Sequence, residues 1–176
     1  MALSGIYPVT LQGVQFEQTW TSLTVAGFPG FLPGDACYDN LGGIWVFVKA
    51  GSAIAVYDLV TISNALIPIS ASATTTTIAA GPVPLGIAQI AIASGSFGWV
   101  WRGPGGGVGH GIKCNLAASC ALDITLYTTG TAGVVDDANV DESVVCGLKS
   151  TATITTAAAA EVIASIPLTC NIFEPD

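Results

Sequence analysis

The chain contains one histidine, His110, which lies in a glycine-rich stretch from Gly105 to Gly111. A catalytic histidine needs a nucleophile and a group that orients its ring, but the chain has no GxSxG elbow and no carboxylate close to His110 in sequence. The glycines also fit neither GxxxxGK[ST] nor GxGxxG, the two patterns that bind phosphate groups. The stretch predicts a flexible surface loop, and we predict no catalytic residue and no enzymatic activity.

Two further sets of side chains are of types that bind metal ions. Asp137, Asn139 and Asp141 alternate as in a calcium loop, but Glu142 stands where that loop requires glycine and Leu148 where it requires glutamate. Five cysteines lack the paired spacing of zinc ligands: Cys37, Cys114, Cys120, Cys146 and Cys170. We predict a solvated acidic loop, small buried thiols, and no bound metal or cofactor. A disulfide between Cys114 and Cys120 stays open as an alternative.

Trp99 and Trp101 are two residues apart, so on a strand their rings face the same side. Alternating aromatic residues of this kind are typical of a core or a subunit interface. The alternative is an exposed platform on which sugar rings stack, together with the loop from Gly103 to Gly111.

The elements that position these residues are predicted to be β-strands. Apolar residues run continuously or alternate, and 21 glycines and 9 prolines interrupt the chain at short intervals. Residues 85 to 102 predict a hairpin with a turn at Ser94 to Ser96, and a single helical turn at Ala157 to Ala160 is the one competing helical signal. The expected strands are 44–48, 59–62, 85–93, 97–102, 123–128, 134–135, 144–148 and 161–168. Short strands with frequent turns indicate a sandwich or barrel.

The charge balance excludes several partners. Four basic and 12 acidic residues give a net charge of −8, so the chain is unsuited to neutralise phosphate groups, and we predict no direct nucleic-acid binding. No window of about 18 residues is apolar throughout, so we predict no transmembrane segment. The first basic residue is Lys49, so no secretory signal is expected and the protein is predicted to be made in the cytoplasm.

Two parts of the chain share a pattern. Residues 48–49, 58–62 and 86–88 recur, with gaps, as residues 112–113, 123–127 and 147–149, which pairs Lys49 with Lys113 and Asp58 with Asp123. Such a repeat predicts two similar β units that close against each other into one barrel-like body.

Residues 1–36 differ from the rest and are named the N-terminal arm here; residues 37–176 form the predicted barrel domain. The arm is rich in aromatic residues and is interrupted by proline and glycine, so it can neither stay solvated nor build its own core. We expect an extended arm that docks its aromatic side chains on a partner subunit, and a barrel that folds without it. The alternative is a segment folded onto its own barrel. The arm's aromatic residues are Tyr7, Phe16, Trp20, Phe28 and Phe31.

Residues 41–54, 84–100 and 117–137 resemble the decoration, or cement, proteins of tailed double-stranded DNA bacteriophages, and the likeness covers roughly residues 37–170. The resemblance implies a compact β-barrel or β-tulip body, commonly a homotrimer, on the outer capsid surface of the virion. There it would clamp neighbouring copies of the major capsid protein and stabilise the head. The alternative is a head-fibre or receptor- or glycan-binding β module. The expected capsid or subunit interface comprises Tyr7, Phe16, Trp20, Phe28, Phe31, Trp99 and Trp101.

Overall fold

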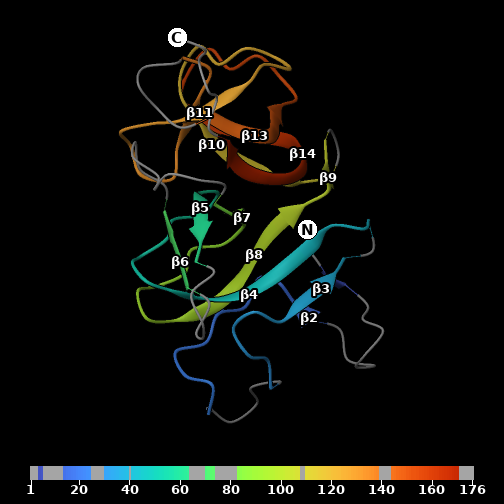
Figure 1. Ribbon diagram of the computed structural model, residues 1–176, viewed down its shortest axis with the longest axis vertical. Coiled ribbons are helices and arrows are strands. Elements are labelled where there is room, and N and C mark those ends of the chain that lie inside the picture. Colours follow the sequence, from blue (N-terminus) through green and yellow to red (C-terminus); the bar gives the residue numbers. More distant parts are fainter. Residues whose placement is uncertain are drawn as a thin grey trace.

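A computed structural model describes residues 4–5, 14–24, 30–39, 41–63, 70–73, 83–107, 110–138 and 144–170. These residues form fourteen β-strands, and the predicted all-β class with a barrel body is confirmed (Figure 1). The competing helical signal at residues 157–160 gives no helical turn in the described part of the chain, because Ala158 already begins strand β14 (Ala158–Cys170). No helix that is long and apolar enough to cross a membrane occurs in the described ranges.

The first barrel is a closed ring of five strands. Its order is β4 (Ile44–Ala50), β6 (Ser70–Ala73), β5 (Leu59–Ile62), β7 (Leu85–Ala88) and β8 (Phe97–Gly103), and β8 pairs with β4 to close the ring. The predicted 85–102 hairpin is confirmed as the antiparallel β7–β8 pair. Its first strand ends at Ala88, earlier than expected, because the chain bends and Ile92 bridges to Ile54 instead. Val48, Val60 and Val100 fill the interior.

A second barrel repeats this arrangement. Its ring runs β10 (Lys113–Leu116), β12 (Val135–Asp136), β11 (Leu126–Thr128), β13 (Val144–Ser150) and β14, and β14 pairs with β10. In each ring, the strand that comes first in the sequence is parallel to the strand that comes third, which gives the parallel pairs β4–β6 and β10–β12. The remaining pairs of both rings are antiparallel. The two halves predicted to be a repeat therefore have the same strand order and the same strand directions.

Two details of the predicted repeat are wrong. Each unit closes its own ring, whereas one shared barrel-like body was expected. The residue pairing is also shifted, because β4 meets β6 at Lys49 and Ala50 whereas β10 meets β12 at Leu116. In the second barrel, the position equivalent to Lys49 of the first barrel is therefore occupied by Leu116 and not by Lys113.

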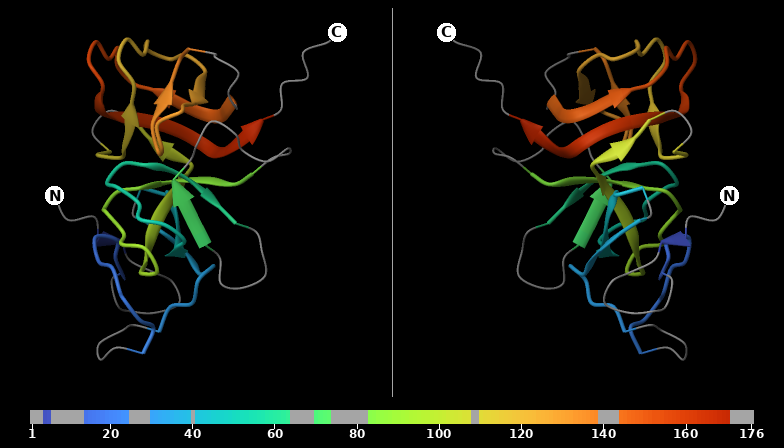
Figure 2. Two further views of the ribbon diagram at one scale, coloured as in Figure 1. Left: turned by 90° about the vertical axis from the view of Figure 1, so that its left-hand side faces the viewer. Right: turned by 90° about the vertical axis from the view of Figure 1, so that its right-hand side faces the viewer.

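The two barrels are joined end to end into an elongated body, with the arm at the end opposite the second barrel (Figure 2). Gln89 and the backbone of Lys113 exchange two hydrogen bonds of 2.9 and 3.1 Å between them. Buried Asp58 accepts a 3.0 Å bond from Asn115 Nδ2, and the Gly133 carbonyl accepts a 2.8 Å bond from Leu59 N. These bonds satisfy polar groups that the junction removes from water, and they fix the barrels relative to each other.

Four short strands lie outside the rings. β3 (Ala36–Tyr38) extends the first sheet along the outer edge of β4, and β9 (Gly105–Gly106) pairs with β14 of the second barrel. β1 (Ser4–Gly5) pairs with β2 (Val14–Gln15) within the arm.

Candidate functional site

An aromatic layer covers the outer face of the first barrel. It consists of Trp45 and Phe47 on β4 and of Trp99 and Trp101 on β8, all at most 1% exposed. Side chains two apart on a strand share a face, so both strands present this pair to the same side. The opposite side chains, Val46 and Val100 among them, belong to the separate interior cluster. Both faces of β4 and β8 are therefore buried, which explains their nearly continuous apolar sequence.

The N-terminal arm supplies the cover of this layer. The ring of Phe16 stacks on Trp45 with centroids 4.1 Å apart and planes at 16°. Trp20 packs edge-on against Phe47 at 5.6 Å, and Phe31 lies edge-on to Trp99 at 5.0 Å. Packing of this kind adds stability beyond the apolar area that it buries. For Phe16, Trp20 and Phe31 the structure shows the alternative in which the segment folds onto its own barrel.

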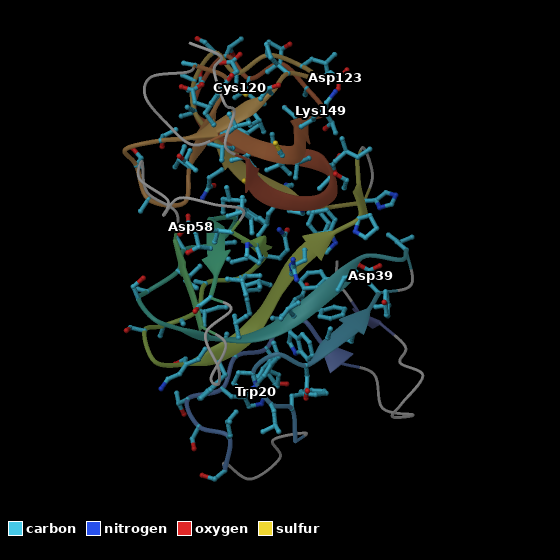
Figure 3. The ribbon with its side chains drawn as sticks, in the orientation of Figure 1. Trp20, Asp39, Asp58, Cys120, Asp123 and Lys149 are labelled. Carbon is cyan, nitrogen blue, oxygen red and sulfur yellow. The ribbon has the colours of Figure 1, made fainter. Side chains whose placement is uncertain are left out.

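Backbone bonds hold the arm at two places. Trp20 and Phe97 exchange hydrogen bonds of 2.9 and 2.7 Å, which makes Trp20 a bridge to the first residue of β8 (Figure 3). Further along, Gly34 N donates to Phe47 O at 2.7 Å, and Phe47 N donates to Asp35 O at 2.8 Å. The arm is thus positioned by main-chain geometry as well as by its rings. Tyr7 and Phe28 lie outside the described residues.

Asp39 organises the turn between β3 and β4. Its carboxylate accepts bonds from Leu41 N at 2.9 Å, from Gly43 N at 2.8 Å and from the indole N–H of Trp45 at 2.8 Å. A Cβ at Gly43 would overlap both Asp39 and the indole nitrogen of Trp101. This turn therefore fixes the orientation of two rings of the aromatic layer.

The tryptophan pair is not an exposed platform. Trp99 and Trp101 are each 1% exposed, and Phe16 and Phe31 pack against Trp99. The alternative in which these rings stack on sugars is wrong, because both rings are buried in the aromatic layer. Their assignment to a capsid or subunit interface stays a prediction.

The glycine-rich stretch joins the two barrels. Gly105 and Gly106 form β9 and pair with Ala164 and Ile163 of β14, so the predicted flexible loop is wrong for this part. A Cβ at Gly106 would overlap the carbonyl oxygen of Val162, which explains why glycine is needed there. The backbone N–H of His110 donates to Gly107 O at 3.1 Å. The sequence feature that could have indicated this pairing is the run of glycines, because glycine allows two backbones, here those of β9 and β14, to approach closely.

The cysteines are mostly buried thiols, as predicted. Cys37, Cys114 and Cys120 are buried thiols that form no disulfide, so the alternative of a Cys114–Cys120 disulfide is wrong. Cys146 is disulfide-bonded, which was not predicted from the sequence. Burial, reinforced by the negative charges of Asp137 and Asp136, raises the pKa of the Cys120 thiol from 9.0 to about 11. Burial and the nearby charge of Asp58 also raise the pKa of the Cys114 thiol.

These thiols predict a loss of stability at high pH. The unfolded chain ionises its thiols near pH 9.0, whereas folded Cys120 keeps its proton up to about pH 11. A raised folded-state pKa contributes stability below the unfolded pKa, and this contribution is lost as the pH rises through the folded pKa. We expect urea-unfolding free energies to fall more over this pH range in the wild type than in Cys120→Ala. Equal losses in the two proteins would show that the pKa of Cys120 is not raised.

The predicted acidic loop is described only in part. Asp137 accepts a 2.8 Å bond from Ala121 N, and Asp136 accepts one of 2.8 Å from Asp137 N, so both carboxylates hold the backbone. Asn139 and Asp141 lie outside the described residues. Within the described ranges, no group of three or more His, Cys, Asp or Glu side chains is arranged to hold a metal ion.

Several exposed apolar side chains were not predicted from the sequence. Leu32, Tyr38 and Leu41 lie on or beside β3 and are 62%, 55% and 55% exposed. Leu122 and Ile124 flank Asp123 at the far end of the second barrel and are 56% and 40% exposed (Figure 3). Contiguous exposed apolar surface marks interaction sites, but no periodicity in the sequence separates these residues from core positions.

No protein-family model matches the chain, and no curated protein matches it. Among solved structures the chain is similar to the N base of the head fiber protein gp8.5 of bacteriophage phi29. The sequence identity is 15% and the TM-score 0.46, and the match covers 74% of this chain and 99% of that chain. A similarity at this level says nothing about what this chain binds.

Proposed function

We propose that this chain is a non-enzymatic structural protein of a bacteriophage head, and specifically a decoration protein. In this role it binds the outer surface of the capsid as a homotrimer and stabilises contacts between neighbouring major capsid subunits. The proposal starts from the sequence resemblance of residues 37–170 to this class. The observation that supports it most is the all-β architecture, because the chain forms closed β-barrels of the kind that the resemblance implies, although two of them are present instead of one.

The distribution of charge supports an outward position. Three of the four basic side chains interact within the chain: Lys149 pairs with Asp123 at 2.8 Å, and the Lys49 and Lys113 ammonium groups lie 5.8 and 5.9 Å from the centroids of Phe97 and Tyr57. The net charge of −8 therefore leaves a predominantly acidic surface. Packaged DNA repels such a surface, which suits the outside of a filled head.

The arm end of the molecule is the proposed capsid contact. Phe16, Trp20, Trp99 and Trp101 are buried, so their part in this contact is to hold the arm in place. The contact itself is made by side chains that the arm exposes, and Leu32 is the most exposed large apolar one among the described residues of the arm. A buried apolar anchor in a partner pocket is a common hot spot of protein interfaces.

The test is sedimentation of the full chain, alone and with undecorated capsid shells of the phage that encodes it. We expect a trimer that co-sediments with the shells, saturates at a fixed number per shell and raises the temperature at which the shells disassemble. Leu32→Asp should weaken shell binding at least about tenfold. Leu122→Asp, a matched change at the opposite end, should bind like the wild type.

Each other result rejects part of the proposal. Saturable binding that leaves shell disassembly unchanged would reject the cement role and favour a head-fibre component. A monomer that ignores the shells would reject the capsid assignment. Equal weakening by Leu32→Asp and Leu122→Asp would reject the arm end as the contact.

A further inference from the structure

Among the described residues, strand β3 leaves one edge of the first sheet open. It is the terminal strand of that sheet, and its one partner in the described part of the chain is β4, through Ala36↔Val46, Cys37↔Trp45 and Tyr38↔Ile44 (Figure 1). Phe47 N donates to Asp35 O, and Asp39 N donates to Gly43 O, in the same register. Hydrogen-bonded pairs alternate in an antiparallel ladder, so Cys37 bonds to β4 whereas Ala36 and Tyr38 do not.

The backbone groups of Ala36 and Tyr38 consequently point away from the barrel. Both residues are exposed, and no hydrogen bond from their N–H or C=O groups to the described residues is present. An open edge with unpaired N–H and C=O groups is a template for a further strand. Leu32, Tyr38 and Leu41 are three of the seven exposed large apolar side chains of the described residues, and all lie within this short segment.

Charge selects which strand can pair there. Asp35 and Asp39 flank β3 on either side. If two copies of β3 paired antiparallel with all three residues in register, Asp35 of each copy would face Asp39 of the other, and like charges directly opposite are destabilising. A strand with a basic residue at each of these positions would gain two opposite-charge pairs.

We propose that β3 is a docking edge for an extended segment of another protein, in which two basic residues four positions apart flank apolar, β-branched residues. The segment adds a strand through the N–H and C=O groups of Ala36 and Tyr38, and its lysine or arginine side chains meet Asp35 and Asp39. This mode takes its affinity from backbone bonds and its specificity from the flanking side chains. The proposal does not depend on whether the segment belongs to a capsid.

The probe is a capped seven-residue peptide in which two lysines, four positions apart, flank valine and threonine residues. Titrated into the full ¹⁵N-labelled chain, it should bind saturably and shift the amide signals of Ala36 and Tyr38. A peptide with glutamate in place of both lysines should bind about tenfold more weakly, since two charge pairs change sign.

Three variants separate this edge from a general effect. Ala36→Pro removes one outward N–H and no bond to β4, so it should abolish binding while near-ultraviolet circular dichroism stays unchanged. Asp35→Asn removes a charge but keeps an oxygen acceptor for the 2.8 Å bond from Leu32 N, and it should weaken binding about threefold. Leu122→Ser, at the far end, is the control and should bind normally.

Several results would overturn the proposal. These are equal binding of the lysine and glutamate peptides, undiminished binding by Ala36→Pro, or amide shifts confined to other strands. Dissociation of an oligomer by Ala36→Pro would show that a second copy occupies the edge. Because the readout is peptide binding, its failure is distinct from a failure to bind capsid shells.

Discussion

Deletion of residues 1–33 is expected to abolish cooperative folding of the remaining chain. The deletion removes Phe16, Trp20 and Phe31, and it exposes the layer formed by Trp45, Phe47, Trp99 and Trp101. Phe16 and Trp20 are buried and Phe31 is half-buried, and a fully buried aromatic ring contributes about 2–3 kcal/mol by burial alone. Together with exposure of the four rings of the layer, the total loss is about 6 kcal/mol or more. Domains of this size are typically stable by only about 5–15 kcal/mol. This reverses the expectation from sequence that the barrel folds without its arm.

The deletion is compared with two single variants of the full chain. Phe16 is 1% exposed, so Phe16→Ala should lower the free energy of unfolding by about 3–5 kcal/mol. Leu32 is 62% exposed, so Leu32→Ala should change it by less than about 0.5 kcal/mol. The measurements are urea unfolding and the near-ultraviolet circular dichroism of the tryptophans. A soluble deletion variant with the wild-type tryptophan spectrum would show that the arm is dispensable for the core.

The sequence predicted the arm's composition correctly but not where its rings bind. Its aromatic residues, broken by proline and glycine, indicate surface that must be covered. Composition does not distinguish a neighbouring subunit from the chain's own barrel. The decision rests on tertiary geometry, namely the 4.1 Å stack of Phe16 on Trp45 and the backbone bonds between Trp20 and Phe97. Neither is encoded in local periodicity.

Strands β4 and β8 of the first barrel could be predicted for a physical reason, whereas β6 of the same barrel was not expected from the sequence. Residues on β4 and β8 are buried on both faces, and such strands read as continuous apolar runs. The glycine strand β9 could not be predicted, because glycine has low strand propensity and its pairing depends on close approach to Val162. The open edge of β3 is a property of strand order, which the sequence leaves undetermined.

Substitution of Gly133 by alanine is expected to destabilise the junction between the barrels strongly. Gly133 has a φ of +76°, where a side chain is strained, and a Cβ there would overlap the side chain of Asp58. That buried carboxylate accepts bonds from Ala55 N at 2.8 Å and from Asn115 Nδ2 at 3.0 Å, so it cannot move without losing the donors that satisfy its oxygens. Strain costs about 1 kcal/mol, and each lost partner adds about 1–3 kcal/mol. We expect a total loss of about 3–5 kcal/mol in the free energy of unfolding.

Gly95 provides a matched control for the backbone term. Its φ of +78° is nearly the same, but a Cβ there meets no atom within 4 Å. Gly95→Ala should therefore cost only the strain of about 1 kcal/mol, and the difference between the two variants measures the overlap with Asp58. In the double variant Asp58→Gly with Gly133→Ala the overlapping atoms are gone, so its cost should be smaller than the sum of the two single costs. Equal stability of Gly133→Ala and Gly95→Ala, or strict additivity in the double variant, would contradict this prediction. Either result would show that the Asp58 side chain moves aside at little cost and that its bonds do not hold the two barrels together.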